Sequence, residues 1–122
     1  ERVQYHLTRD EWSIHFNVTR DGTLMTGDGG DPGQVAKAQN GRWIYLFRPE
    51  LLEDKGLPDP HFVRPGVLHA ERLVNMSKHE YRLEPNVSFT PDQQWVVFRS
   101  NMFGATYVFA VEVAKRANTD SR

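Results

Sequence analysis

The 122-residue sequence predicts an all-β protein built from antiparallel, four-stranded units. Three observations support this fold class. Short runs rich in β-branched and aromatic residues recur along the chain, turn residues such as Gly, Pro, Asn and Asp separate them, and the pattern of one part of the chain returns in another. With 39% hydrophobic and 25% charged residues, the chain has the composition of a globular unit rather than of a disordered one.

Eight segments have the pattern of a β-strand. In chain order they are Val3–Leu7, Ile14–Val18, Thr23–Thr26, Trp43–Phe47, Leu68–Val74, Val87–Phe89, Trp95–Phe98 and Tyr107–Val111. The segment between Phe47 and Leu68 contains four prolines and two glycines, which is typical of a long loop, with at most one helical turn at 50–55. A weak helical pattern occurs at 110–116.

Two parts of the chain share one pattern, "IHFNVTRDGTLMTGDG" and "PNVSFTPDQQWVVFRSN". Each contains a strand, a Thr-x-Asp turn and a second strand, so that Thr19 aligns with Thr90 and Asp21 with Asp92, 71 residues further on. A third strand follows in both copies and a fourth only in the first. Four antiparallel strands per repeat indicate a β-propeller blade, and a propeller needs about four to eight blades. The chain is therefore predicted to form about two blades of a larger ring.

The repeat also predicts how the chain is divided. Residues 1–12 are expected to end a preceding blade, 13–78 to form a blade with a long Pro-rich loop at 48–67, 79–113 to form a final, incomplete blade, and 114–122 to be a tail. The sequence opens inside a predicted strand without an initiator Met, so we interpret it as part of a longer precursor. The remaining blades are expected from that precursor or from a second chain.

Charge and composition exclude several partners. The formal net charge is −1, which gives no reason to expect binding to nucleic acid or to anionic lipid. No apolar run approaches the roughly 20 residues that span a bilayer, and no membrane partner is predicted. Without cysteine there is no thiolate metal site.

Side chains that bind hard cations occur at matching positions of the two copies. The offset of 71 residues pairs His15 with Asn86 and Ser13 with Glu84. Because the innermost strand of each blade lines the central channel of a propeller, we expect His15, Glu84 and Asn86 to converge from neighbouring blades. An imidazole, a carboxylate and an amide suit Mn²⁺, Mg²⁺ or Ca²⁺. The same residues also fit a structural interpretation, as hydrogen-bonded channel residues and strand-entry caps.

Two further features bear on this site. Strand alternation predicts two faces for the first inner strand, with Ile14, Phe16 and Val18 on one and Ser13, His15 and Asn17 on the other. In "GDGGDPG", Asp28 and Asp31 lie among four glycines, which fits either a cation-binding loop or a glycine-rich turn with Asx hydrogen bonds.

Two stretches carry a family resemblance. "WSIHFNVTRDGTLMTGDGGDPG" and "EPNVSFTPDQQWVVFRSNMFGATYVFAVEV" resemble the C-terminal part of oligogalacturonate lyases, seven-bladed propellers that cleave short pectic oligosaccharides and use Mn²⁺. The resemblance covers residues from about 12 to 113 and implies that His15 is a metal ligand. Where the family has His-Pro-His, this chain has Glu84-Pro85-Asn86, and the family's Gln falls near Tyr81. Only one of four ligand types is kept, and the family's catalytic base lies upstream of this chain.

The sequence and the resemblance together predict a bacterial polysaccharide lyase, an oligogalacturonate lyase-like carbon–oxygen lyase. It would cleave uronate-containing, pectic oligosaccharides by metal-assisted β-elimination. Mn²⁺ is the expected cofactor, with Ca²⁺ or Mg²⁺ as alternatives, and an anionic oligosaccharide is the expected partner. The predicted roles are metal ligands at His15, Glu84 and Asn86, catalytic residues at His79 and Arg82, and substrate-binding residues at Arg82 and Arg99.

Two other functions stay open at this point. A non-catalytic propeller that binds protein or glycan at its channel mouth, similar to the repeat domains of periplasmic translocation proteins, is favoured by the loss of the His-Pro-His. A hydrolase on the same scaffold is the third alternative, because a fold does not determine a function. The sequence leaves the compartment undecided between bacterial cytoplasm and periplasm.

Overall fold

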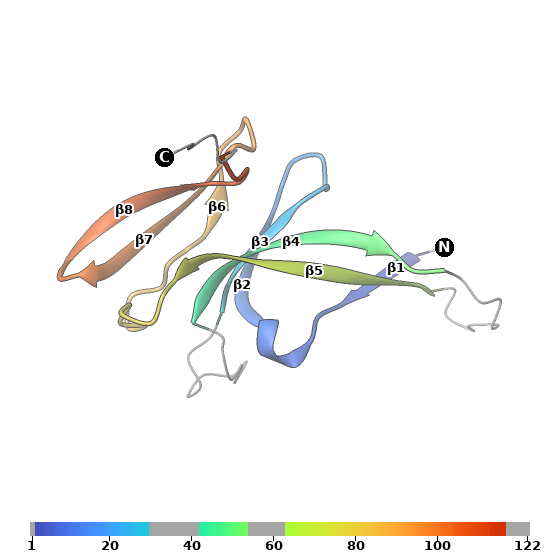
Figure 1. Ribbon diagram of the computed structural model, residues 1–122, viewed down its shortest axis with the longest axis horizontal. Helices are drawn as coiled ribbons and strands as arrows, with labels where there is room; N and C mark the ends of the chain where they lie inside the picture. Colours follow the sequence, from blue (N-terminus) through green and yellow to red (C-terminus); the bar gives the residue numbers. More distant parts are fainter. Residues whose placement is uncertain (1, 30–41, 54–62, 117–122) are drawn as a thin grey trace, which may run out of the picture.

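The computed structural model describes residues 2–29, 42–53 and 63–116, apart from the side chains of residues 9 and 63. The described residues form eight β-strands and one short 3₁₀ helix, and they contain no α-helix (Figure 1). None of this helical structure is long and apolar enough to cross a bilayer. The predicted all-β fold is confirmed.

The strands belong to two sheets. The first has five strands in the order β1-β5-β4-β3-β2, and the second has three in the order β6-β7-β8. The bounds are β1 Arg2–His6, η1 Arg9–Glu11, β2 Ser13–Val18, β3 Met25–Gly29, β4 Trp43–Leu51, β5 Val63–Asn75, β6 Ser88–Phe89, β7 Trp95–Phe103 and β8 Ala105–Glu112.

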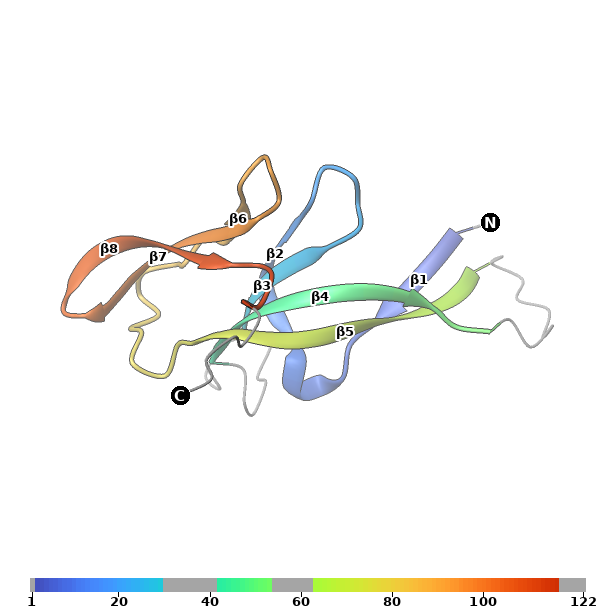
Figure 2. The same cartoon turned by 45° about the horizontal axis from the view of Figure 1, so that its top comes forward.

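Strands β2 to β5 pair antiparallel with their sequence neighbours and form one four-stranded blade. Strand β1 is added outside this blade, where it runs parallel to the outer strand β5 with Tyr5 opposite Gly66. Strands β6 to β8 form the beginning of a second blade, which lies beside β2 and β3 in both views (Figures 1 and 2). The chain therefore contains about two blades. The exact division of the chain into blades, with residues 1–12 ending a preceding one, stays a prediction.

Strands β4, β5 and β7 are several residues longer than the sequence suggested, and the expected loop is shorter. Strand β4 continues past Phe47 to Leu51, so that Pro49 lies within it and pairs with Leu68 of β5. Proline is tolerated there because β3 pairs with β4 only as far as Phe47, which leaves the remainder of β4 an edge on that side. Two weak helix expectations also fail within the described residues, because 50–51 and 110–112 are strand.

The Thr-x-Asp turns of the two copies have the same hydrogen bonds. In the first, the Thr19 hydroxyl donates to Asp21 Oδ1 over 2.8 Å, and the Thr19 backbone N–H donates to the carbonyl of Leu24. The second copy repeats this with a 2.6 Å bond from Thr90 to Asp92 and a backbone bond to Trp95. The repeat predicted from the sequence is thus present in atomic detail.

Strand β4 is buried on both faces. On one face, Ile44 and Leu46 join a cluster with residues of the second sheet, among them Val96 and Phe98. The other face carries Tyr45 and Phe47, whose rings stack against each other with centroids 5.7 Å apart. The first cluster ties the two blades together, and its buried members are Ile44, Leu46, Met76, Val87, Val96, Phe98 and Val113.

Candidate metal centre

A small cavity of about 180 Å³ lies where the inner strand of the first blade meets the segment that leads into the second. Strand β2 contacts β6, and this contact brings residues from the two blades together. The cavity is lined by Ile14, His15, Asp28, Tyr81, Arg82, Glu84 and Pro85.

His15 and Glu84 approach each other across this cavity. The Nε2 atom of His15 lies 4.0 Å from Oε1 of Glu84, and the two side chains are 44% and 61% exposed. This separation is too long for a hydrogen bond. Two ligands that each lie about 2.1–2.4 Å from one cation can be about 3–4.5 Å apart, so the separation suits a shared ion. The convergence expected for these two residues is present; their role as ligands stays a prediction.

Asn86 is placed differently from the other two predicted ligands. Its backbone has a φ of 53°, in the left-handed region that Asn enters more readily than most residues. Its side chain is exposed and does not line the cavity. Asn86 therefore ends the turn into β6, and its assignment as a ligand also stays a prediction.

Asp28 on β3 is the residue of this cavity that the sequence analysis did not place there. It is 2% exposed, and its Oδ1 accepts a 3.1 Å hydrogen bond from the backbone N–H of His15. The same oxygen lies 3.3 Å from Nδ1 of the His15 ring. The second carboxylate oxygen, Oδ2, is buried without a hydrogen-bond partner in the structure. Burial raises the pKa of Asp28 above its ordinary value, against the opposing effect of the His15 backbone hydrogen bond.

A β-bulge determines this arrangement and corrects the predicted faces of β2. Ser13 pairs with Gly29 but His15 pairs with Asp28, so one residue of β2 is extra. The bulge puts Ser13 on the same face as Phe16, where Ser13 packs over Gly27 and Phe16 lies 5.8 Å from the ring of Phe47. The prediction that Ser13 and His15 share a face was wrong, because strict alternation fails at a bulge.

His79 lies in the interior and does not line the cavity, and its catalytic role stays a prediction. It is 5% exposed, and its Nδ1 and Nε2 lie 2.7 Å from the Ser100 hydroxyl and from the Leu83 carbonyl respectively. Because a carbonyl only accepts, Nε2 carries the proton and Nδ1 accepts from the Ser100 hydroxyl. With both nitrogens in use, His79 holds the loop before β6 against β7.

The two arginines differ in their surroundings. Arg82 lines the cavity with a side chain that is 91% exposed and pairs with Glu80 at 2.7 Å. Such an exposed ion pair is weak, and the guanidinium is able to turn toward a ligand. Arg99 instead donates from Nε to the carbonyl of Glu84 over 2.7 Å and from its backbone N–H to Pro85. It therefore fixes the segment that carries Glu84, and its predicted contact with substrate stays untested.

The donor set of the cavity fits part of what a divalent cation requires. Within the described residues, no group of three or more His, Cys, Asp and Glu side chains is placed to hold a metal ion. His15 and Glu84 nevertheless face one cavity. The buried Oδ2 of Asp28 has no hydrogen-bond partner, and a positive charge nearby would compensate for its negative charge. Imidazole and carboxylate donors fit a hard or borderline cation such as Mn²⁺.

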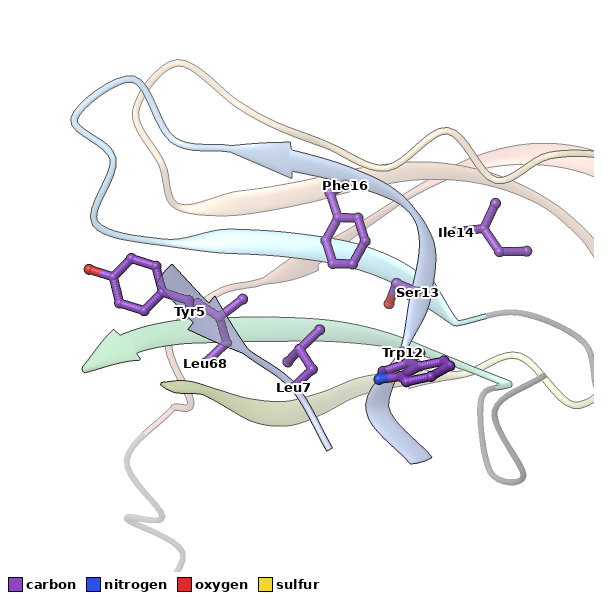
Figure 3. A pocket seen from close by; sticks show the side chains of 7 residues that line it. All are labelled: Tyr5, Leu7, Trp12, Ser13, Ile14, Phe16 and Leu68. Atoms are coloured by element: carbon purple, nitrogen blue, oxygen red, sulfur yellow. The ribbon is translucent and has the colours of Figure 1, made fainter. Parts of the chain in front are cut away.

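The opposite face of the first blade carries a larger, apolar cavity of about 580 Å³ (Figure 3). Phe16 and Trp12 on this face are 50% and 42% exposed. The side chains that line it are Tyr5, Leu7, Trp12, Ser13, Ile14, Phe16 and Leu68. These mostly apolar side chains are typical of a face that packs against another sheet rather than of a polar binding site.

The four-stranded blade, the second sheet beside it and the inner strands that meet at one cavity define the class of this protein as part of a β-propeller. Comparison with known proteins agrees. The chain is similar to an oligogalacturonide lyase of Pectobacterium atrosepticum, with 30% identity over 105 residues that cover 81% of this chain and 25% of the relative. It is also similar in structure to an oligogalacturonate lyase solved in complex with manganese, with a TM-score of 0.58 and 20% identity over 86% of this chain and 24% of the other.

These comparisons confirm the resemblance noted in the sequence. At 20% identity the structural likeness establishes the fold alone. The chain spans about a quarter of the length of both lyases. A scan against protein-family models found no match.

Proposed function

We propose that this chain is the metal-bearing end of a polysaccharide lyase that cleaves uronate-containing, oligogalacturonide-like substrates by β-elimination. The observation that carries the proposal is the approach of His15 and Glu84 from two neighbouring blades, with Nε2 and Oε1 4.0 Å apart at one cavity. The similarity to two lyases of this class supports the substrate.

Under this proposal His15 and Glu84 bind the cation directly. Asn86, whose side chain lies outside the cavity lining, would contribute only through water. The carboxylate of Glu84 takes the place of an imidazole in the family's ligand set, so the site is adapted to a harder cation. Mn²⁺ remains the first candidate because the solved lyase contains manganese, with Ca²⁺ and Mg²⁺ as alternatives.

The residues of this chain would bind and orient the substrate carboxylate. When bound, the cation supplies positive charge that stabilises the carboxylate as negative charge develops on loss of the adjacent proton. Arg82, at the mouth of the cavity, exchanges its exposed partner Glu80 for the substrate carboxylate and adds a second positive charge. Arg99 keeps the Glu84 segment in place through its backbone carbonyl. The proton-abstracting base is expected on another blade.

The direct test is incubation of the full-length protein with oligogalacturonides, before and after removal of divalent ions with EDTA. The expected result is ultraviolet absorbance of an unsaturated uronate product, lost with EDTA and restored by Mn²⁺. His15→Ala should abolish both the bound metal and the product. His69→Ala, which removes an exposed imidazole on β5, is the matched control and should leave both unchanged. Failure of the metal-loaded wild type to form product would reject the lyase proposal.

One observation favours the alternative of a non-catalytic binding propeller. The described part of the chain has no complete cluster of acidic and histidine ligands. This alternative predicts saturable binding of oligogalacturonides, or of a protein, without formation of product. Calorimetric titration, combined with the absorbance assay, distinguishes binding without product from catalysis.

The remaining blades are proposed as the partner of the apolar face in Figure 3. Strand β4 packs one face against the second blade, and the equivalent packing of its other face would cover the cavity next to Phe16. The chain covers about a quarter of its lyase relatives, which leaves length for several such blades.

A further inference from the structure

The buried carboxylate of Asp28 has no assigned role, although it contacts the residue on which the metal proposal depends. It is 2% exposed, and its Oδ1 accepts the His15 backbone N–H. Its Oδ2 has no hydrogen-bond partner. A carboxylate buried this deeply is costly unless a nearby group compensates for its charge.

The nearest candidate for that compensation is the His15 ring. Nδ1 lies 3.3 Å from Oδ1 of Asp28, whereas Nε2 lies 4.0 Å from the carboxylate of Glu84. An ionised carboxylate only accepts hydrogen bonds, so a ring nitrogen held beside it must carry the proton. A neutral imidazole has one protonated nitrogen, and the lone pair is then left on Nε2.

We propose that Asp28 is a positioning residue that fixes His15 in its Nδ1–H tautomer and aims the Nε2 lone pair into the cavity beside Glu84. This inference rests on the proposed function, because the Nε2 lone pair would bind the proposed cation. A histidine that binds a metal commonly donates its other N–H to a carboxylate in this way. The β-bulge contributes, because it brings position 15 opposite Asp28 in the register of β2 and β3.

Asp28 has a double role at position 15, and both contacts go to its Oδ1. Its Oδ1 fixes the backbone of position 15 and its carboxylate faces the ring of the same residue. Backbone and ring are therefore oriented by a single side chain.

The test measures the tautomer in the absence of metal. The full-length protein is labelled with ¹⁵N in its histidine rings, the His15 signals are assigned by their loss in His15→Ala, and spectra are recorded after EDTA treatment at pH about 8, where histidine is ordinarily neutral. The expected spectrum has Nδ1 protonated. Asp28→Ala removes the acceptor beside Nδ1 and should shift the proton toward Nε2, whereas Asp28→Asn, whose Oδ1 still accepts the His15 backbone N–H and lies beside Nδ1, should keep Nδ1 protonated.

Metal binding provides the second readout. Asp28→Ala is expected to weaken Mn²⁺ binding about 10–100-fold, while Glu112→Gln, which removes the same charge from an exposed pair with Arg116, should have no effect. A wild-type ring that is protonated at Nε2, or a ring that stays protonated at Nδ1 in Asp28→Ala, would overturn the inference even if Mn²⁺ binds normally. Absence of Mn²⁺ binding together with the expected tautomers would instead count against the proposed function alone.

Discussion

One extra residue determines which way His15 points. With regular alternation along β2, Ser13 and His15 would share a face; the bulge between them turns Ser13 toward Phe47 and His15 toward Asp28. Bulges of this kind are frequent next to functional sites because they redirect a side chain without breaking the sheet. At the scale of single residues, the candidate centre depends on this local irregularity and on the buried carboxylate opposite it.

Asp21 provides a residue-scale prediction about pH. Hydrogen bonds lower the pKa of Asp21 from 3.8 to about 2. The largest effect comes from the Thr23 hydroxyl, followed by the Thr23 backbone N–H and the Thr19 hydroxyl. Since the folded pKa is below the unfolded one, the unfolded state binds more protons between these values, and stability rises with pH across that window. The stabilisation is present above the unfolded pKa and is lost as pH falls toward 2.

Asp21→Asn should remove this part of the acid dependence. The amide still accepts hydrogen bonds, but neutral ones are weaker than those to a carboxylate. The urea midpoint of the variant should therefore be lower than that of wild type at pH about 6, and the difference should shrink near pH 2. Parallel curves for the two proteins over the whole range would contradict the assignment.

At the scale of elements, the paired Thr-x-Asp turns shape the inner hairpins, and β1 extends the first blade at the edge opposite β2. The turns repeat their hydrogen bonds at equivalent positions, which explains why the two inner hairpins have the same shape. Gly22 in the first turn and Gln93 in the second both have positive φ, at 73° and 62°. The parallel pairing of β1 with β5 has no counterpart in the second sheet.

Gly66→Ala tests the pairing of β1 with β5. A methyl group at position 66 would lie 2.5 Å from Cδ1 of Tyr5 and 3.1 Å from the carbonyl oxygen of Glu50. The variant should lose about 1–3 kcal/mol of unfolding free energy by overpacking. Tyr5→Ala in the same chain should recover part of the loss. A cost below about 0.5 kcal/mol, the usual effect of a surface change, would show that Tyr5 does not cover Gly66.

The sequence predicted the strands well because their signals are local. Alternation and turn residues place all eight strands of the described residues, and the repeat correctly related Thr19 to Thr90. The end of β4 was predicted too early, because Pro49 is typical of a loop. Proline is tolerated at an edge that pairs with no strand on one side, and such an edge is visible only in the assembled sheet. The parallel position of β1 is also set by pairing over a long sequence distance.

The candidate site was only partly predictable for the same reason. His15 and Glu84 were found because the offset between copies relates their strands. The burial of His79 was not predictable, since its partners, Ser100 and Leu83, are known only once β7 packs against the loop. Asp28 was noted only as part of a possible cation-binding loop, because its place opposite His15 depends on the bulge in the register of β2 and β3.

At the scale of the whole molecule, the two buried faces of strand β4 determine how the blades pack. Ile44 and Leu46 of β4 pack toward the second sheet, and Tyr45 and Phe47 point to the face with the apolar cavity. In a propeller each blade is sandwiched between two others, so both faces should be covered. The exposed aromatic residue Phe16 lies on the face that has no such cover in this chain.

Phe16→Ala in the full-length protein tests whether another blade covers this face. Phe16 is 50% exposed in this chain. If a neighbouring blade buries it, truncation should cost about 3 kcal/mol or more in unfolding free energy, as for a core phenylalanine. If the face stays open, about half of that is expected, because only half of the ring leaves an apolar environment. A cost of about 1.5 kcal/mol or less would contradict packing of a further blade on this face.

The account as a whole depends on one cation held between two blades. Anomalous diffraction from crystals of the full-length protein grown with Mn²⁺ measures this most directly. The account predicts a manganese peak in the cavity within about 2.4 Å of both Nε2 of His15 and a carboxylate oxygen of Glu84. A peak bound to other residues, or no peak at a Mn²⁺ concentration that saturates binding in solution, would contradict it.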